Sequence, residues 1–126
     1  MIAGAMSERP PFKILHRDEL ERNGSWRLAR RSLGVGAFGV NIVDIVPGDR
    51  IPEHDESERD QEEVFVVLRG TATLMIDGTP HLMPVGTLAR LDPHLRRTVV
   101  NEGKEPTSVM IVSAPRTSGY EPMVWA

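Results

Sequence analysis

The chain has 126 residues and a net charge of −3, and its hydrophobic content of 40% and charged content of 26% are ordinary for one globular domain. This charge balance gives no basic surface for nucleic acid or an anionic membrane, and the absence of cysteine excludes disulfides and thiolate metal sites. No stretch approaches the ~18 apolar residues of a membrane helix, and no basic region precedes a long apolar segment at the N-terminus. We therefore expect one cytoplasmic domain that binds neither nucleic acid nor membrane.

The N-terminal third predicts little regular structure. Residues 1–11 are expected to form a loose leader, and residues 12–15 a short edge strand. Residues 17–22 favour one or two turns of helix, whereas the alternation of apolar and polar side chains over residues 26–31 predicts a strand. The glycine-rich stretch 33–39 lacks the Lys-Ser/Thr ending of a phosphate-binding loop, so we interpret it as a connection between strands.

The rest of the chain predicts short strands separated by turn residues, which is typical of an all-β sandwich or barrel. The expected strands cover residues 40–46, 64–68, 71–76, 80–83, 86–91, 95–101 and 106–113. Asp77-Gly78 predicts a tight hairpin, and the strand at 64–68 is apolar on both faces, so both faces should be covered. The single domain would thus have a core barrel at about 26–114 and a C-terminal tail at 115–126.

The acidic stretch between Gly48 and Gly70 holds the best candidates for a functional site. His54, Glu56 and Glu63 lie in it, and such side chains can converge when they project from neighbouring strands. Nitrogen and oxygen donors of this kind suit Zn, Fe, Mn or Ni. The sequence therefore allows a divalent metal site at these three residues.

Two spaced motifs in this region resemble those of the cupin family. The first motif has a glycine, then five residues, then a histidine, two further ligand positions and a closing glycine. The second has a glycine, a Pro-x-Gly and two later polar positions. These positions are occupied by Gly48, His54, Glu56, Glu63 and Gly70, and by Gly78, Pro84, Gly86, Arg97 and Asn101. The resemblance implies a double-stranded β-helix, or jelly-roll barrel, with a short N-terminal helical segment.

The resemblance also shows where the chain departs from the family's metal cage of three histidines and one glutamate. Glu56 and Arg97 stand at two of the histidine positions, so that His54 and Glu63 alone match the family pattern. Because a guanidinium repels a cation, we expect Arg97 to pair with Glu63 in bidentate fashion and no cofactor to be required. The alternative is a divalent metal on His54, Glu56 and Glu63, with His94 as a possible substitute ligand.

Three functions remain open at this point. The first is a domain that binds a small anionic molecule at a degenerate metal site, in a pocket formed by His54, Glu63, Phe65, Arg97 and Asn101. Arg97 would anchor the anion, and His54 or Glu63 would transfer a proton in any reaction. The second is a metal-dependent dioxygenase or isomerase, and the third is a non-catalytic sensor or assembly module.

A homodimer is the expected assembly, because the chain has more apolar surface than a small barrel can cover. The residues behind this expectation are Val64, Val66, Leu68, Leu33, Val35, Phe38 and Trp125. Large exposed apolar patches usually mark an interface, and two-fold pairing is the commonest solution.

Overall fold

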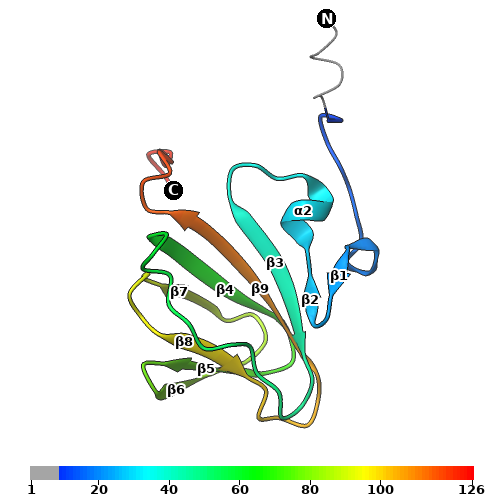
Figure 1. Ribbon diagram of the computed structural model, residues 1–126, viewed down its shortest axis with the longest axis vertical. Helices are drawn as coiled ribbons and strands as arrows, with labels where there is room; N and C mark the ends of the chain where they lie inside the picture. The colour runs from blue at the N-terminus through cyan, green and yellow to red at the C-terminus, as the bar shows by residue number, and fades with distance from the viewer. Residues whose placement is uncertain (1–8) are drawn as a thin grey trace, which may run out of the picture.

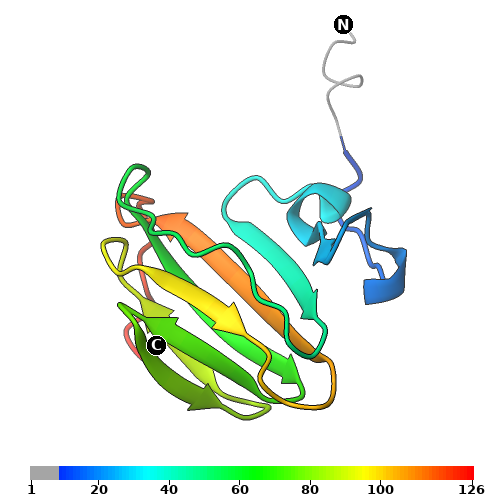
Figure 2. The same ribbon diagram turned by 60° about the horizontal axis from the view of Figure 1, so that its bottom comes forward.

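The computed structural model describes residues 9–126 and forms two antiparallel sheets that face each other (Figures 1 and 2). The larger sheet has the strand order β1-β2-β3-β9-β4-β7 and the smaller sheet the order β6-β5-β8. In chain order the elements are η1 (Arg17–Glu19), β1 (Arg22–Asn23), β2 (Trp26–Arg27), α2 (Ala29–Leu33), β3 (Gly39–Ile45), β4 (Gln61–Arg69), β5 (Ala72–Ile76), β6 (Thr79–Met83), β7 (Leu88–Leu91), β8 (Arg97–Val100) and β9 (Thr107–Pro115). The all-β prediction with a short N-terminal helical segment is confirmed. Most of the predicted leader at 1–11 falls outside the described residues.

The N-terminal segment differs from two predictions. Residues 12–15 form no strand, since both Phe12 and Ile14 are exposed and no neighbouring strand is available to pair with them. The strand expected at 26–31 ends after Arg27 and is followed by the short helix α2. Its residues, Ala-Arg-Arg-Ser-Leu, include strong helix formers, and Gly34 closes the helix in the left-handed conformation at φ 77°. A brief alternation was thus overridden by local helix propensity and a glycine cap.

Asp44 of β3 fastens this N-terminal segment to the larger sheet. Its carboxylate accepts hydrogen bonds from Arg17, from Arg27 Nε at 2.8 Å and from Ser108 Oγ at 2.6 Å. Partial burial opposes ionisation of Asp44, but the hydrogen bonds from Arg17, Ser108 and Arg27 outweigh it and lower the pKa to about 2. The segment before β3 is therefore held by charge-assisted hydrogen bonds as well as by the short strands β1 and β2.

The hydrophobic core lies between the two sheets. Strand β4 alternates as a period of two requires, so that Glu63, Phe65 and Val67 are buried on its inner face. The Asp77-Gly78 hairpin joins β5 to β6 with both residues at positive φ, 48° and 83°, as its sequence predicts. The buried apolar side chains of the core are Val43, Ile45, Ile51, Phe65, Val67, Ala72, Leu74, Met83, Leu91, Val99, Val109 and Ile111.

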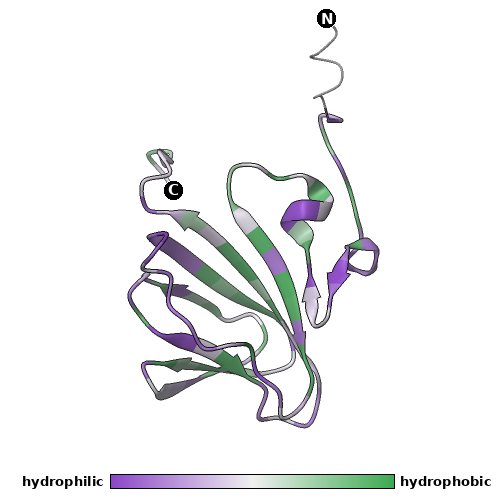
Figure 3. Ribbon diagram, in the orientation of Figure 1, coloured by the Kyte–Doolittle hydropathy of each residue, from purple (hydrophilic) through white to green (hydrophobic). Residues whose placement is uncertain are grey.

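The outer face of the larger sheet is not covered in the way that its sequence predicts. Val64 and Val66 are only half-buried, and Leu68 is 44% exposed. Cross-strand pairing places apolar residues in two rows on this face, namely Val40, Val112 and Val64, and Ile42, Met110 and Val66. Hydrophobic residues accordingly run along β3, β9 and β4 in Figure 3. We call this surface, formed by the two rows and Leu68, the outer apolar face.

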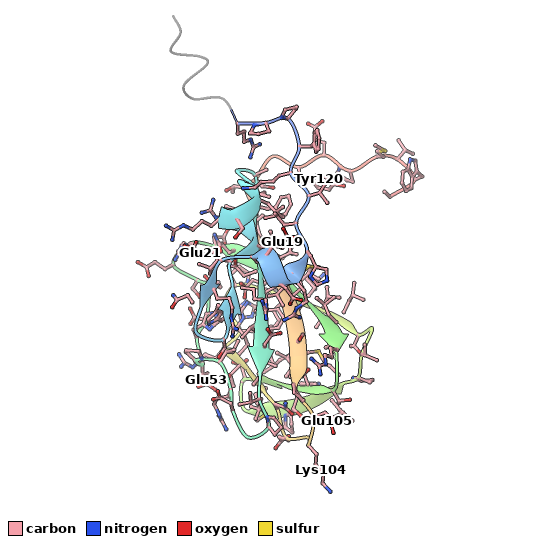
Figure 4. All side chains as sticks on the ribbon, turned by 90° about the vertical axis from the view of Figure 1, so that its right-hand side faces the viewer. Glu19, Glu21, Glu53, Lys104, Glu105 and Tyr120 are labelled. Carbon is pink, nitrogen blue, oxygen red and sulfur yellow. The ribbon has the colours of Figure 1, made fainter. Side chains whose placement is uncertain are left out.

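The C-terminal tail at 116–126 does not pack on its own barrel. It extends past Tyr120 away from the sheets (Figure 4), and the Trp125 side chain is 83% exposed. Its first residue is anchored, because Arg116 pairs with Asp60 at 2.6 Å. Within residues 9–126, no helix has the length and apolar character needed to cross a membrane.

Candidate metal and ligand site

A cavity of about 310 Å³ opens beside the inner face of the larger sheet. Strands β2, β3, β4 and β9, the irregular segment 51–56 and the turn that follows it supply its walls. The lining residues are Trp26, Asn41, Ile51, Pro52, His54, Glu56, Arg59, Gln61, Glu63, Ile111 and Ser113. Its volume is at the lower end of the range of ~300–1,000 Å³ for small-molecule sites, which favours a ligand smaller than a drug molecule.

His54 is positioned by its own backbone and by that of Pro52. It exchanges two backbone hydrogen bonds with Arg97 of β8, at 3.0 and 2.8 Å. Its Nδ1 lies 3.0 Å from the Pro52 carbonyl oxygen, which can only accept, so the ring donates from Nδ1. The other nitrogen, Nε2, is directed to Glu56 Oε1 at 3.2 Å. This is the arrangement in which a backbone carbonyl fixes the tautomer of a ligating histidine.

Glu56 is held at the mouth of the cavity by the backbone on both of its sides. Its N–H donates to the Pro93 carbonyl at 2.8 Å, and its own carbonyl accepts from Gln61 N–H at 3.2 Å. The longer spacing between Glu56 and Glu63 is accommodated in a turn at 57–60, where Asp60 adopts φ 51°. The extra residues therefore form a closed turn and leave both carboxylates at the cavity.

Glu63 is the most buried carboxylate of the site, with 6% of the residue exposed. It lies on β4 between Leu91 of β7 and Ser113 of β9. Burial raises the pKa of Glu63 above its ordinary value, and the neighbouring Glu56 raises it further, whereas the charges of Arg97 and His54 oppose the rise. A positive charge close by therefore stabilises the ionised form of Glu63.

Arg97 is fully buried, but its guanidinium is mostly engaged away from the cavity. It donates to the carbonyl oxygens of Leu95 at 2.6 Å, Pro93 at 3.4 Å and Asp92 at 3.4 Å. Only Nε faces Glu63, 3.5 Å from Oε1, and neither of these two atoms has a hydrogen-bond partner. The prediction that the two side chains pair is confirmed, but the bidentate geometry is wrong because the neighbouring loop carbonyls engage the terminal nitrogens.

The side chains of His54, Glu56 and Glu63 converge on one point. One donor atom from each lies within 4.8 Å of the others. With bond lengths of about 2.0–2.2 Å, two donors of one cation lie at most about 4.4 Å apart, so a small movement of the side chains toward one another lets the set hold a divalent ion. The buried Glu63 Oε1, which no N–H or O–H group reaches, supports the same fit. The three residues named as metal candidates from the sequence therefore do meet in space.

Other predicted site residues lie elsewhere. Phe65 is fully buried in the hydrophobic core and does not line the cavity. Asn101 donates to the carbonyls of Ile45 and Glu105, both at 2.8 Å, and accepts from Gly103 N–H at 2.9 Å, so its amide already has partners. His94 is exposed on the loop before β8 and is also absent from the lining.

Sequence reasoning missed several residues that do line the cavity, among them Trp26, Asn41 and Arg59. Trp26 and Asn41 belong to β2 and β3, and the residue alternation within each strand shows which side chains share a face but not which face is inner. Arg59 lies in an acidic run that resembles an ordinary solvated loop. Its place at the cavity depends on the conformation of the turn at 57–60.

Comparison with known proteins supports the architecture. The family of the Cupin domain matches residues 41–113. A cupin protein from Bacteroides fragilis has a solved structure that superposes with a TM-score of 0.76 at 18% identity, covering 93% of this chain and 94% of that one. No curated protein matches the chain.

Two further solved structures are similar over most of the chain. A sugar phosphate isomerase of the cupin superfamily from Silicibacter pomeroyi gives a TM-score of 0.70 at 21% identity, covering 81% of this chain and 75% of that one. A conserved protein with a double-stranded β-helix domain from Klebsiella pneumoniae gives 0.67 at 25% identity, covering 85% and 93%. Likeness at this level of identity supports the double-stranded β-helix fold and says nothing of the reaction.

Proposed function

The chain belongs to the cupin family, and on this premise we propose that its cavity binds a small anionic molecule together with a divalent cation. His54, Glu56 and Glu63 would hold the cation. The observation that carries the proposal is the convergence of their donor atoms within 4.8 Å at a cavity of about 310 Å³. The objection from Arg97 is weaker than the sequence suggests, since carbonyl oxygens of the loop before β8 engage its terminal nitrogens.

The charges of the site favour an anionic ligand. A divalent cation, Arg59 and Arg97 bring four positive charges, and ionised Glu56 and Glu63 bring two negative ones, which leaves two positive charges to balance. A buried excess charge is costly unless it is paired, so an anion that reaches the cation completes the site. Bound there, the cation would supply Lewis-acid polarisation to an oxygen of the ligand.

Proton transfer is a second candidate function, and the environment of Glu63 favours it. Burial raises the pKa of Glu63, which makes this carboxyl group a better proton acceptor than an exposed carboxylate. Isomerisation of a hydroxy-carbonyl compound needs such a group beside a polarised carbonyl, and one structural neighbour is a sugar phosphate isomerase. The Glu63→Gln variant should then bind the reactive compound and fail to convert it. A non-catalytic sensor would convert no compound at all.

Calorimetric titration with Mn²⁺, Ni²⁺ and Zn²⁺ tests the cation site. We expect one ion per wild-type chain, and at least about tenfold weaker binding by His54→Ala and by Glu56→Gln, because each loses one direct ligand. Binding should also strengthen with rising pH, since the ligands must lose their protons.

Glu58→Gln is the matched control. Glu58 is exposed in the same turn and does not line the cavity. Equal affinities for wild type, His54→Ala, Glu56→Gln and Glu58→Gln would overturn the cation site.

A further inference from the structure

We infer that Arg59 is the anchor for the anionic end of the ligand, which is a small organic carboxylate or phosphate monoester. The inference rests on the proposed function, because it assumes that the cavity is the binding site. Among the residues that line the cavity, Arg59 is the only Lys or Arg. Arg97, expected from the sequence to be the anchor, is fully buried and not part of the lining.

The guanidinium of Arg59 is free for a ligand. It forms no ion pair or side-chain hydrogen bond within residues 9–126. Of the carboxylates near it in the chain, Asp60 binds Arg116 at 2.6 Å and Asp55 accepts from Ser57 N–H at 3.2 Å, while the exposed Glu58 forms no ion pair with Arg59 within residues 9–126. Glu62 points the other way and lines a hollow on the outside of the larger sheet. Arg59 is exposed and lines the cavity, so a ligand there can reach its guanidinium.

The turn that carries Arg59 is fixed at both ends. Asp60 N–H donates to the Ser57 carbonyl and Gln61 N–H to the Glu56 carbonyl, each at 3.2 Å, and Arg116 N–H donates to the Asp60 carbonyl at 3.1 Å. The same turn therefore supplies Glu56 to the cation site and, three residues later, Arg59 to the cavity. The backbone of Arg59 is thus held beside the cavity, and its long side chain brings a positive charge to one wall.

The walls define the chemical class of the ligand. Oxygen atoms of the ligand would bind at the cation end near His54, and its oxyanion would bind Arg59, whose planar fork matches a carboxylate or a phosphate. Ile51, Ile111 and Trp26 contribute apolar surface to the same cavity. A short hydroxylated acid or sugar-type phosphate ester fits this pattern, whereas a neutral sugar or alcohol leaves Arg59 unpaired.

Calorimetry with four probes tests this inference on the full chain in the presence of Mn²⁺. Malate and its neutral diamide form the carboxylate pair, and glycerol phosphate and glycerol form the phosphate pair. We expect at least one of the two anions to bind wild type and both neutral partners to bind far more weakly. Arg59→Gln should weaken the binding of that anion by about 10- to 100-fold, as loss of a charge-assisted hydrogen-bond pair predicts, and leave the Mn²⁺ affinity unchanged. Arg59→Lys should retain part of the affinity.

Arg50→Gln is the control, since it removes an exposed arginine that does not line the cavity. It should bind the anion like wild type, and an equal loss in Arg50→Gln and Arg59→Gln would overturn the inference as a long-range effect of charge. Unchanged anion affinity in Arg59→Gln would also overturn it, as would a wild type that binds Mn²⁺ but neither anion. A wild type that binds an anion through Arg59 without Mn²⁺ would instead support the anchor and contradict the cation part of the proposed function.

Discussion

The Arg97→Ala substitution should lower the free energy of unfolding by about 3–5 kcal/mol at neutral pH, the range for breaking a buried ion pair from one side. The side chain is fully buried, so no solvent replaces what is lost. Three loop carbonyls lose their donor, of which the Leu95 carbonyl at 2.6 Å has the shortest bond. Glu63 loses the charge 3.5 Å from its Oε1. A loss of this size is a large part of the ~5–15 kcal/mol that stabilises a typical domain.

The pH dependence of this loss separates the lost hydrogen bonds to the loop carbonyls from the lost positive charge beside Glu63. Burial already raises the pKa of Glu63, and removing Arg97 removes the largest opposing effect, so the pKa rises further. A carboxyl group with a raised pKa stabilises the fold below its unfolded value of about 4.5, and this stabilisation is lost as pH rises through the folded value. The cost of Arg97→Ala should therefore be smaller near pH 5 than near pH 7.5.

Urea unfolding of wild type, Arg97→Ala, Glu63→Gln and the double variant at both pH values measures these terms and their coupling. Arg96→Ala is the control, because Arg96 is exposed and its pair with Glu53 at 3.3 Å should contribute less than about 1 kcal/mol. If Arg97→Ala costs no more than Arg96→Ala, and equally at both pH values, the buried pair contributes no more than a solvated one and the reasoning fails.

Three further outcomes are expected. Arg97→His should bind Ni²⁺ and Zn²⁺ more tightly than wild type by calorimetry, because it exchanges a fixed positive charge for a neutral imidazole; equal affinities would place Arg97 outside the influence of the site. Asp44→Asn should lower the free energy of unfolding by about 1–2 kcal/mol at pH 7, which is less than the full shift of the pKa from 3.8 to about 2 corresponds to, because Asp44 is partly solvated. The stability of this variant should also fall less than that of wild type as pH drops from about 4 to 2, and parallel pH profiles would contradict the prediction. Light scattering should give the mass of two 14.0 kDa chains for wild type and of one for Val66→Lys, which places a charge on the outer apolar face; a monomeric wild type would refute the dimer.

Much of the barrel follows from the sequence because turn residues and the period of two act locally. Asp77-Gly78 can hardly form anything other than a tight hairpin, and the period of two puts Glu63, Phe65 and Val67 on one side of β4, which the resemblance to the cupin motifs implies is the inner side. The meeting of His54, Glu56 and Glu63 also followed from spacing and from the resemblance to the cupin motifs. These features depend on residues close together in the chain.

The remaining features depend on partners far away in the chain, and single-sequence patterns carry little information about them. Arg97 is directed inward as expected, but the direction of its terminal nitrogens depends on the path of the loop 92–95. The cluster around Asp44 joins residues separated by as many as 91 positions. Residues 12–15 have the pattern of a strand and lack a neighbour to pair with, which no local pattern can show.

The hydrogen bonds that hold the segment 51–56 give the candidate site an intrinsic reporter. His54 and Arg97 exchange two of them, Ile51 N–H donates to the Val99 carbonyl at 3.1 Å, and Glu56 N–H donates to the Pro93 carbonyl at 2.8 Å. These hydrogen bonds can break locally while β4 and β9 stay paired, so the amide protons of segment 51–56 should exchange with deuterium sooner than those of the larger sheet. A molecule that binds to both His54 and Glu63 keeps these hydrogen bonds closed. Each tenfold excess of that molecule over its Kd should therefore slow amide exchange by local opening about tenfold. Deuterium uptake along 51–56 would thus register occupancy of the cavity for colourless compounds and in the absence of any turnover.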